Sequence, residues 1–136
     1  MITVGIVGNG FVGESQIFAF SPTNEIRVYD IDPLKSTHRK EETHKSDFIF
    51  VCVPTPMNTD GRQDLSFIEK VFEESVEGPI YIIKSTVLPG TTEKLQEKYA
   101  ESLVVIGFPA NDFKGQETKD NETIAAFCKK RFCKLL

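Results

Sequence analysis

The chain has 136 residues, of which 40% are hydrophobic and 26% charged, and its formal net charge is −4. A chain of this length is expected to form one domain that buries about two thirds of its unfolded surface, too little for a cofactor domain together with a full substrate domain. The acidic balance argues against nucleic acid or an anionic membrane as a partner. There is no apolar run of about eighteen residues and no charged leader before the first predicted strand, so we expect no membrane span and a cytoplasmic protein.

The first predicted strand, Ile2–Val7, runs directly into a glycine-rich turn, and a second strand, Ile26–Asp30, ends in an acidic residue. This order is typical of a parallel sheet that binds a dinucleotide at its start. Gly8 permits a tight turn out of the strand, Gly10 lets the backbone approach a pyrophosphate, and Gly13 lets the next helix pack closely on the sheet. Backbone N–H groups at the start of that helix are expected to face the phosphates.

Asp30 follows Gly13 by seventeen residues, close to the separation at which a second strand presents a carboxylate to the adenosine ribose. A carboxylate at this place repels a 2′-phosphate and therefore favours NAD over NADP. Arg27, Lys35 and Arg39 lie nearby in the sequence and weaken this preference without reversing it. We predict NAD as the cofactor, with NADP as the alternative.

Three further apolar runs predict strands at Phe48–Val53, Ile80–Lys84 and Leu103–Gly107. Their continuous hydrophobicity indicates a parallel sheet that is covered on both faces. The polar segment Pro33–Ser46, whose one large apolar residue is Leu34, cannot supply another buried strand. We therefore predict an α/β fold with a Rossmann-like, doubly wound sheet of about five parallel strands in the order 2-1-3-4-5, without the usual third strand and helix of the first half. The cofactor crevice is expected between the first and third strands, where the order reverses.

Three helices are predicted after the third strand, at Leu65–Glu77, Thr91–Ala100 and about Glu122–Leu135. In the first, Ser66 and Glu69 have the spacing of a capping box, and Gly78-Pro79 forms a stop. The last carries an apolar stripe along one side. We expect residues 1–113 to form the cofactor-binding domain and 114–136 to form a tail whose amphipathic helix packs on that domain or on a partner subunit.

Polar side chains follow the later strands at the edge where the crevice is expected. Pro54 and Pro56 fix the backbone on either side of Thr55, which predicts either a rigid ledge against the nicotinamide ribose or a stiff turn without a binding role. Ser85 and Thr86 offer hydroxyls after the fourth strand that helix capping does not explain. Asp112 is a candidate acid, although a solvated loop residue is the interpretation that we favour.

The three cysteines fit a reducing compartment without a disulfide framework. Cys52 lies in an apolar strand and is interpreted as a core residue. Cys128 and Cys133 have a spacing that suits neither a metal pair nor a local disulfide, and His38 and His44 have no acidic cluster beside them at ligand spacing. We predict no metal site.

Five motifs in this order closely resemble the N-terminal domain of the UDP-glucose/GDP-mannose dehydrogenase family: Gly8–Gly13, Tyr29–Pro33, Val51–Pro56, Asp64–Ile68 and Lys84–Glu93. The resemblance covers about residues 1–113. The family oxidises the primary alcohol of a sugar nucleotide to a carboxylate in two hydride transfers to NAD, through a thiohemiacetal on a cysteine. The resemblance therefore implies NAD as the cofactor and a UDP- or GDP-sugar as a further ligand.

By position, the resemblance also implies roles for single residues. The pyrophosphate would be held by the glycine loop, which comprises Gly8, Asn9, Gly10, Phe11, Val12 and Gly13. Asp30 and Lys35 would hold the adenosine ribose. The nicotinamide side would be lined by Val53, Pro54, Thr55 and Thr86, and Thr86 would also help to position the water used in catalysis.

Two departures from the family pattern concern catalysis. The family's glutamate that works with this water follows the last strand of the domain, and Ala110 stands at that place. Alanine can neither accept a proton nor orient water. The family's catalytic cysteine belongs to a later domain, and the surroundings of Cys128 and Cys133 do not match it. We therefore expect an incomplete catalytic site.

Three functions follow as alternatives. The chain is an oxidoreductase that completes its site in a homodimer or with another chain, or a non-catalytic NAD-binding or regulatory module, or a structural protein that docks through its C-terminal helix. The sequence leaves open whether it is an enzyme.

Overall fold

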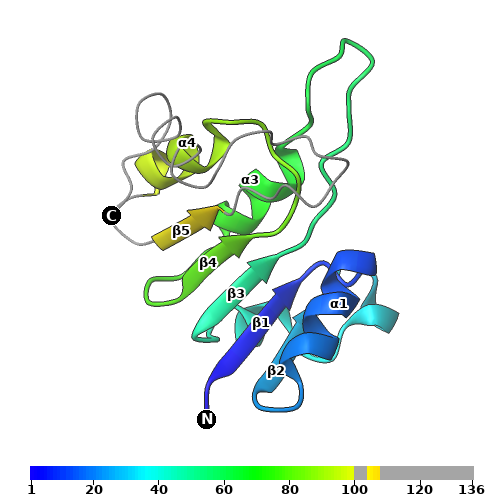
Figure 1. Ribbon diagram of the computed structural model, residues 1–136, viewed down its shortest axis with the longest axis vertical. Coiled ribbons are helices and arrows are strands. Elements are labelled where there is room, and N and C mark those ends of the chain that lie inside the picture. Colours follow the sequence, from blue (N-terminus) through cyan, green and yellow to red (C-terminus); the bar gives the residue numbers. More distant parts are fainter. Residues whose placement is uncertain (100–103, 108–136) are drawn as a thin grey trace, which may run out of the picture.

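The computed structural model describes residues 1–99 and 104–107. Five parallel strands form one sheet in the order β2-β1-β3-β4-β5 (Figure 1). Their bounds are Thr3–Val7 for β1, Glu25–Tyr29 for β2, Phe48–Val51 for β3, Ile80–Ile83 for β4 and Val104–Gly107 for β5. The predicted Rossmann-like sheet and its strand order are thus confirmed. Ala110, Asp112, Cys128, Cys133 and the predicted last helix and tail lie outside the described residues.

The strands are those that the apolar runs predicted, with ends that differ by one or two residues. Ile6 in β1 pairs in register with Val28 of β2 on one side and with Phe50 of β3 on the other. The central strand is therefore flanked by apolar residues of both neighbouring strands. In β3 and β4 three consecutive residues of four are buried, so both faces of these strands are covered, which is why their sequences are continuous in hydrophobic residues.

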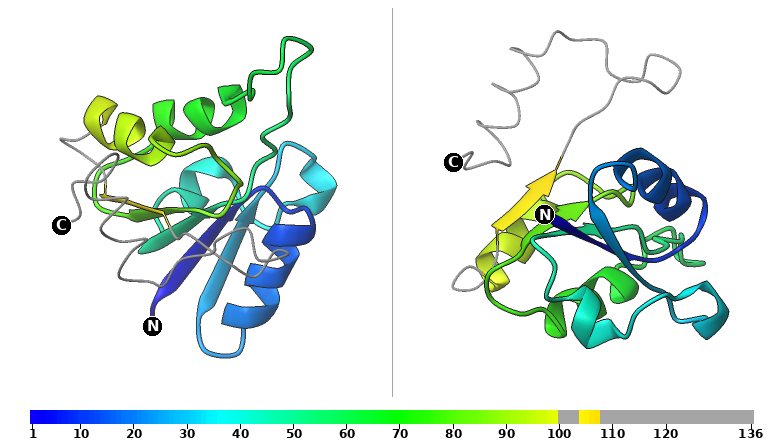
Figure 2. Two further views of the ribbon diagram at one scale, coloured as in Figure 1. Left: turned by 45° about the horizontal axis from the view of Figure 1, so that its top comes forward. Right: turned by 90° about the horizontal axis from the view of Figure 1, so that it is seen from below.

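Helices cover the two faces of the sheet unequally (Figure 2). One face carries α1 (Phe11–Phe20), whose Ile17 and Phe20 pack on the sheet. The other face carries α2 (Lys40–Thr43), α3 (Ser66–Glu73) and α4 (Thr91–Lys98). The core on this second side is built from buried residues of the sheet and of α3 and α4: Val7, Ile49, Val51, Ile68, Val71, Phe72, Tyr81, Ile83 and Leu95. Among the described residues, no helix is both long and apolar enough to cross a membrane.

Helix α3 is shorter than predicted, and its start is stabilised differently. It spans Ser66–Glu73 rather than Leu65–Glu77, and its N-cap residue makes no side-chain hydrogen bond, so the predicted capping box is wrong. Instead, Oδ1 of Asp64 accepts a hydrogen bond from the backbone N–H of Ser66 at 2.9 Å. At the other end, the hydroxyl of Ser75 donates to the carbonyl of Phe72 at 2.6 Å, and Gly78, with φ +113°, lies in the turn into β4.

The segment between β2 and β3 crosses the sheet without another strand, as predicted. It contains a short 3₁₀ turn, η1 (Pro33–Lys35), and the single turn of α2. Although the segment is polar, Thr43, His44 and Ser46 are buried, which the sequence did not predict. The close contact depends on Gly5 in β1, because a Cβ at that position would lie 2.8 Å from the carbonyl oxygen of Thr43.

Candidate functional site

The candidate site lies at the carboxyl edge of the sheet. Since all five strands are parallel, the segments that follow them emerge along the same edge, which is the upper edge in Figure 1. These segments are the glycine loop after β1, η1 after β2, the long loop over 52–65 after β3 and the loop over 84–90 after β4. The order of the strands reverses between β1 and β3, where ligands of such sheets bind.

Two glycines of the loop are required by close backbone contacts. Gly8 has φ +94°, and a Cβ there would lie 2.8 Å from the carbonyl oxygen of Cys52 at the end of β3. A Cβ on Gly13 would lie 2.1 Å from the carbonyl oxygen of Gly8. The loop therefore folds tightly between β1, β3 and α1, and this explains both glycines without any ligand.

Gly10 is different, because a Cβ on it would meet no atom within 4 Å. It is the N-cap residue of α1, and no side chain caps the helix. Within the described part of the chain, the backbone N–H groups of Phe11, Val12 and Gly13 find no acceptor. Unpaired N–H groups at a helix start attract anions, so this end of α1 fits a phosphate group.

Asp30 connects the glycine loop to the residues after β2. Its Oδ2 accepts a hydrogen bond from the backbone N–H of Asn9 at 2.7 Å, and its Oδ1 accepts one from the N–H of Asp32 at 2.8 Å. The side-chain amide of Asn9 donates to the carbonyl of Lys35 at 2.8 Å. The structure thus brings Asn9, Asp30 and Lys35 together. Each carboxylate oxygen of Asp30 has a second lone pair with which to accept a hydroxyl group.

The residues predicted for the nicotinamide side also meet. The hydroxyl of Ser85 donates to the carbonyl of Val53 at 2.6 Å, and the hydroxyl of Thr55 donates to the carbonyl of Thr86 at 2.7 Å. Pro54 and Thr86 are exposed. The Cys52 N–H donates to the carbonyl of Val7 at 2.8 Å, which ties this group to the strand that leads into the glycine loop.

Two residues that hold these segments were missed in the sequence. Ser36 accepts a hydrogen bond from the N–H of Asp30 at 2.8 Å, and Gln63 bonds to the loop after β4 through both ends of its carboxamide. Neither residue belongs to a recognisable motif, since each bonds to backbone that only the fold brings near. Polar residues beside a predicted turn were the only available signal.

Cys52 is unsuited to act as a nucleophile at this edge. Burial raises the pKa of its thiol to about 12, although the nearby Lys84 ammonium opposes this rise. The thiol is therefore neutral at physiological pH, and the thiolate is the reactive form. In residues 1–99 and 104–107, no cluster of three or more histidine, cysteine or acidic side chains is arranged to hold a metal ion.

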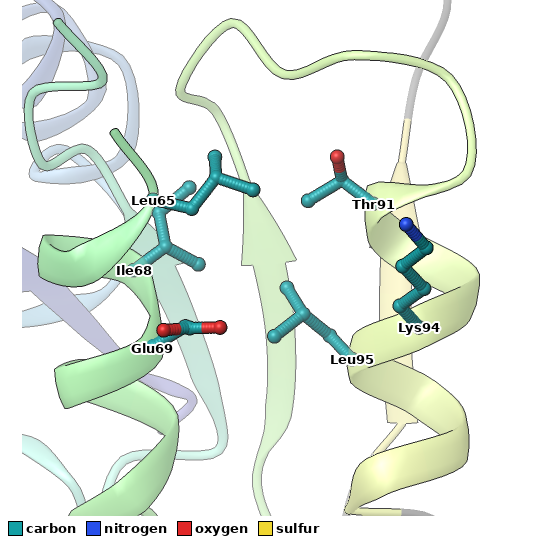
Figure 3. Close-up of a pocket in the computed structure, with 6 residues that line it drawn as sticks. All are labelled: Leu65, Ile68, Glu69, Thr91, Lys94 and Leu95. Atoms are coloured by element: carbon teal, nitrogen blue, oxygen red, sulfur yellow. The ribbon is translucent and has the colours of Figure 1, made fainter. Parts of the chain in front are cut away.

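A small cavity of about 90 Å³ lies away from the glycine loop, between α3 and α4 (Figure 3). Leu65, Ile68 and Glu69 line it from the α3 side, and Thr91, Lys94 and Leu95 line it from α4. Dinucleotides and drug-sized ligands occupy several hundred Å³. The cavity contains none of the predicted site residues, and its size suits water rather than a cofactor.

Comparison with known proteins gives one family match, over residues 33–113, to the model described as the UDP-glucose/GDP-mannose dehydrogenase family, NAD binding domain. Over 72 residues, the chain is 39% identical to UDP-N-acetyl-D-mannosamine dehydrogenase of Pyrococcus horikoshii, which corresponds to 50% of this chain and 17% of that protein. Over 67 residues, it is 36% identical to GDP-mannose 6-dehydrogenase of Pseudomonas aeruginosa, which corresponds to 44% of this chain and 15% of that protein.

Solved structures share the fold at low sequence identity. A UDP-glucose dehydrogenase from Pyrobaculum islandicum superposes with a TM-score of 0.65 at 19% identity, over 94% of this chain and 43% of that one. A ternary complex of GDP-mannose dehydrogenase from Pseudomonas aeruginosa gives a TM-score of 0.63, also at 19% identity, over 95% of this chain and 43% of that one. The chain thus spans less than half the length of these relatives.

Proposed function

Because the chain belongs to the UDP-glucose/GDP-mannose dehydrogenase family and matches its NAD-binding domain, we propose that it binds NAD at the carboxyl edge of its sheet. The pyrophosphate lies against the glycine loop, and the two halves of the cofactor extend to either side of it, over β2 and over β3 and β4. The residues in these places are the twelve assigned above by resemblance.

The uncapped start of α1 is the observation that carries this proposal. The N–H groups of Phe11, Val12 and Gly13 are unpaired within the described residues, and the space beside Gly10 is open to a group that approaches the backbone. Three N–H donors around such a space are the arrangement that a phosphate requires.

Asp30 supports the preference for NAD over NADP. Its carboxylate is fixed at the end of β2 by two backbone N–H groups, so it cannot readily turn away from a ligand. A 2′-phosphate placed there would meet a negative charge at short range, whereas ribose hydroxyls can donate hydrogen bonds to it. Lys35, in η1, is assigned to the same ribose site by the resemblance, and its backbone carbonyl accepts the side-chain amide of Asn9.

At the other end of the crevice, Val53, Pro54, Thr55 and Thr86 line the nicotinamide side. NAD bound there would supply a hydride acceptor, and these residues would position its nicotinamide. Ala110 occupies the place of the family's glutamate, so we propose a cofactor-binding module that does not by itself oxidise a sugar nucleotide. The predicted tail over 114–136 is proposed to pack on this domain or on a partner subunit.

The proposed NAD binding is tested by thermal unfolding of the purified chain. NAD, NADP and UDP-glucose are each added separately. Ligand at about a hundredfold over its dissociation constant adds about 2.7 kcal/mol to the free energy of unfolding. We expect a rise in the unfolding temperature with NAD and a smaller rise with NADP. The absence of any NAD effect at millimolar concentration would contradict the proposal, and formation of NADH with a sugar nucleotide would contradict the non-catalytic assignment.

Asp30→Asn is the variant that tests the ribose site. Its matched control is Glu25→Gln, which removes the same charge at the opposite end of β2, where Glu25 forms an ion pair with Arg27. We expect D30N to lower NAD affinity and to narrow the difference between NAD and NADP, while E25Q leaves both unchanged. Equal NAD affinities of D30N and the wild type would show that the ribose site is placed wrongly.

A further inference from the structure

The carbonyl oxygen of Thr86 accepts two hydrogen bonds from the loop that follows β3. The hydroxyl of Thr55 donates one at 2.7 Å, and Nε2 of Gln63 donates the other at 2.8 Å. The same carboxamide accepts a third bond, because Oε1 of Gln63 lies 3.3 Å from the backbone N–H of Leu88. Gln63 therefore hydrogen-bonds to the backbone of the loop after β4 at two residues, Thr86 and Leu88, on either side of Val87.

Gln63 is held in place by the base of the long loop after β3, which projects from the sheet (Figure 1). Met57 and Gln63 form an antiparallel bridge. The Asn58 N–H donates to the carbonyl of Arg62 at 2.7 Å, and the Asp64 N–H donates to the carbonyl of Pro56 at 2.8 Å. The loop is thus a short hairpin with Gln63 at its base, and the half-buried Gln63 side chain bonds to the neighbouring segment.

The loop after β4 is fixed from its other side by Ser85. The backbone N–H of Lys84 donates to the carbonyl of Val51 at 2.9 Å, and the hydroxyl of Ser85 donates to that of Val53 at 2.6 Å. These bonds fix the start of the loop to the sheet but do not reach beyond Ser85. The orientation of the Thr86 peptide therefore depends on Thr55 and Gln63, while the exposed Thr86 hydroxyl forms no bond within the described part of the chain.

We propose that Gln63 is a positioning residue for the nicotinamide side of the crevice, which it serves by holding Thr86 through its main chain. This inference rests on the proposed binding of NAD. Gln63 does not touch the cofactor. Its carboxamide, which donates through Nε2 and accepts through Oε1, sets the distance between two loops. The loop after β3 supplies Val53, Pro54 and Thr55, and the loop after β4 supplies Thr86.

Two substitutions distinguish the hydrogen bond to the Thr86 carbonyl from the hydrogen bond to the Leu88 N–H. Gln63→Met keeps the length of the side chain but removes both hydrogen-bonding groups. Gln63→Glu keeps the acceptor for the Leu88 N–H and replaces the donor to the Thr86 carbonyl with an oxygen. Arg62→Ala is the matched control, because Arg62 neighbours Gln63 on the same hairpin and its side chain is 87% exposed.

The first measurement needs no ligand. Amide hydrogen exchange of Leu88, followed by nuclear magnetic resonance, is expected to be about fivefold faster in Q63M than in the wild type, which corresponds to the loss of one hydrogen bond. Q63E and R62A are expected to exchange at Leu88 at the wild-type rate. Exchange in the β-strands remains unchanged in all three variants, which shows that the fold is intact. Equal rates at Leu88 in Q63M and the wild type would overturn the inference.

The second measurement compares NAD with ADP-ribose, which lacks the nicotinamide. Titration calorimetry is expected to show that Q63M and Q63E weaken NAD binding about fivefold and leave ADP-ribose binding unchanged. A purely structural role would weaken both ligands by one factor, so an unchanged ratio of the two affinities would overturn the inference. If the wild type binds neither ligand, the proposed function fails as well, and that failure is recognised because it does not depend on any substitution.

Discussion

The hydroxyl of Tyr81 lies 3.0 Å from Nδ1 of His44, and these two side chains are 0% and 2% exposed. The Tyr81 oxygen also accepts the backbone N–H of Val76 at 3.3 Å, so the hydroxyl bonds to two partners. The Tyr81 ring packs on Phe72, with 5.4 Å between the ring centroids. One buried pair thus joins the crossover segment, β4 and the end of α3.

Stability is expected to fall in mild acid because of His44. Burial lowers the pKa of His44 below its ordinary value of 6.5; the nearby Glu74 opposes this shift, and Lys40 adds to it. Below pH 6.5 the unfolded chain takes up a proton that the folded chain does not. The stabilising contribution is therefore complete above this pH and is lost as pH falls toward the folded pKa, with a slope of at most about 1.4 kcal/mol per pH unit.

Urea unfolding between pH 7.5 and pH 5 measures this slope. In His44→Gln the slope should become smaller, since glutamine can still hydrogen-bond to the Tyr81 hydroxyl but does not titrate. An identical slope in H44Q and the wild type would assign the acid sensitivity to other groups.

Tyr81→Phe is expected to destabilise the fold without changing its shape. The substitution leaves the N–H of Val76 and Nδ1 of His44 without their partner in a buried region, which costs about 1–3 kcal/mol. Chemical denaturation gives the difference in the free energy of unfolding. A stability equal to that of the wild type would mean that water replaces the hydroxyl.

Gly13→Ala is expected to lower stability by about 3 kcal/mol. The added Cβ would lie 2.1 Å from the carbonyl oxygen of Gly8, so either the glycine loop or α1 must move. Thermal unfolding without ligand measures the loss. Wild-type stability in G13A would show that the loop and the helix can separate freely.

Gly10→Ala is the matched change in the same loop. Unlike Gly13→Ala, it is expected to affect NAD affinity more than stability. Its Cβ meets no atom within 4 Å, and replacing an N-cap glycine by alanine costs at most about 1 kcal/mol. The methyl group would, however, occupy the space in which we propose that the pyrophosphate binds. We expect near-native stability with NAD affinity reduced about tenfold or more, measured by calorimetry; unchanged affinity would remove the phosphate from this position.

Cys52 is expected to react slowly with thiol reagents in the folded protein. With a pKa of about 12, its thiolate fraction at pH 8 is lower than that of an ordinary cysteine by about a hundredfold or more. The measurement uses the Cys128→Ser, Cys133→Ser double variant, so that Cys52 alone reports, and compares native buffer with urea. Similar rates in the two conditions would contradict the burial of the thiol.

The sheet could be predicted from sequence because its signals are local. The run at Phe48–Val51 is hydrophobic on both faces, and Gly8, Gly10 and Gly13 follow a strand and begin a helix. The gathering of Asp30 with Asn9 could also be expected, since parallel strands place the residues after them on one edge.

The remaining features depend on contacts that have no local pattern. His44 lies in a polar stretch, and its burial depends on a hydrogen bond with Tyr81, 37 residues away. Asp64, rather than the predicted pair of Ser66 and Glu69, stabilises the start of α3, because several side chains near a helix start compete for the same N–H groups. Gln63 bonds across 23 residues to Thr86.

The two hydrogen bonds that Asp30 accepts have a consequence for the evolution of this sequence. Since the carboxylate holds the N–H groups of Asn9 and Asp32, selection for folding alone would retain it even in a descendant that no longer met a nucleotide. Nothing in the packing demands a glycine at position 10. In a descendant that no longer bound a nucleotide, position 10 would therefore be freer to change than position 30.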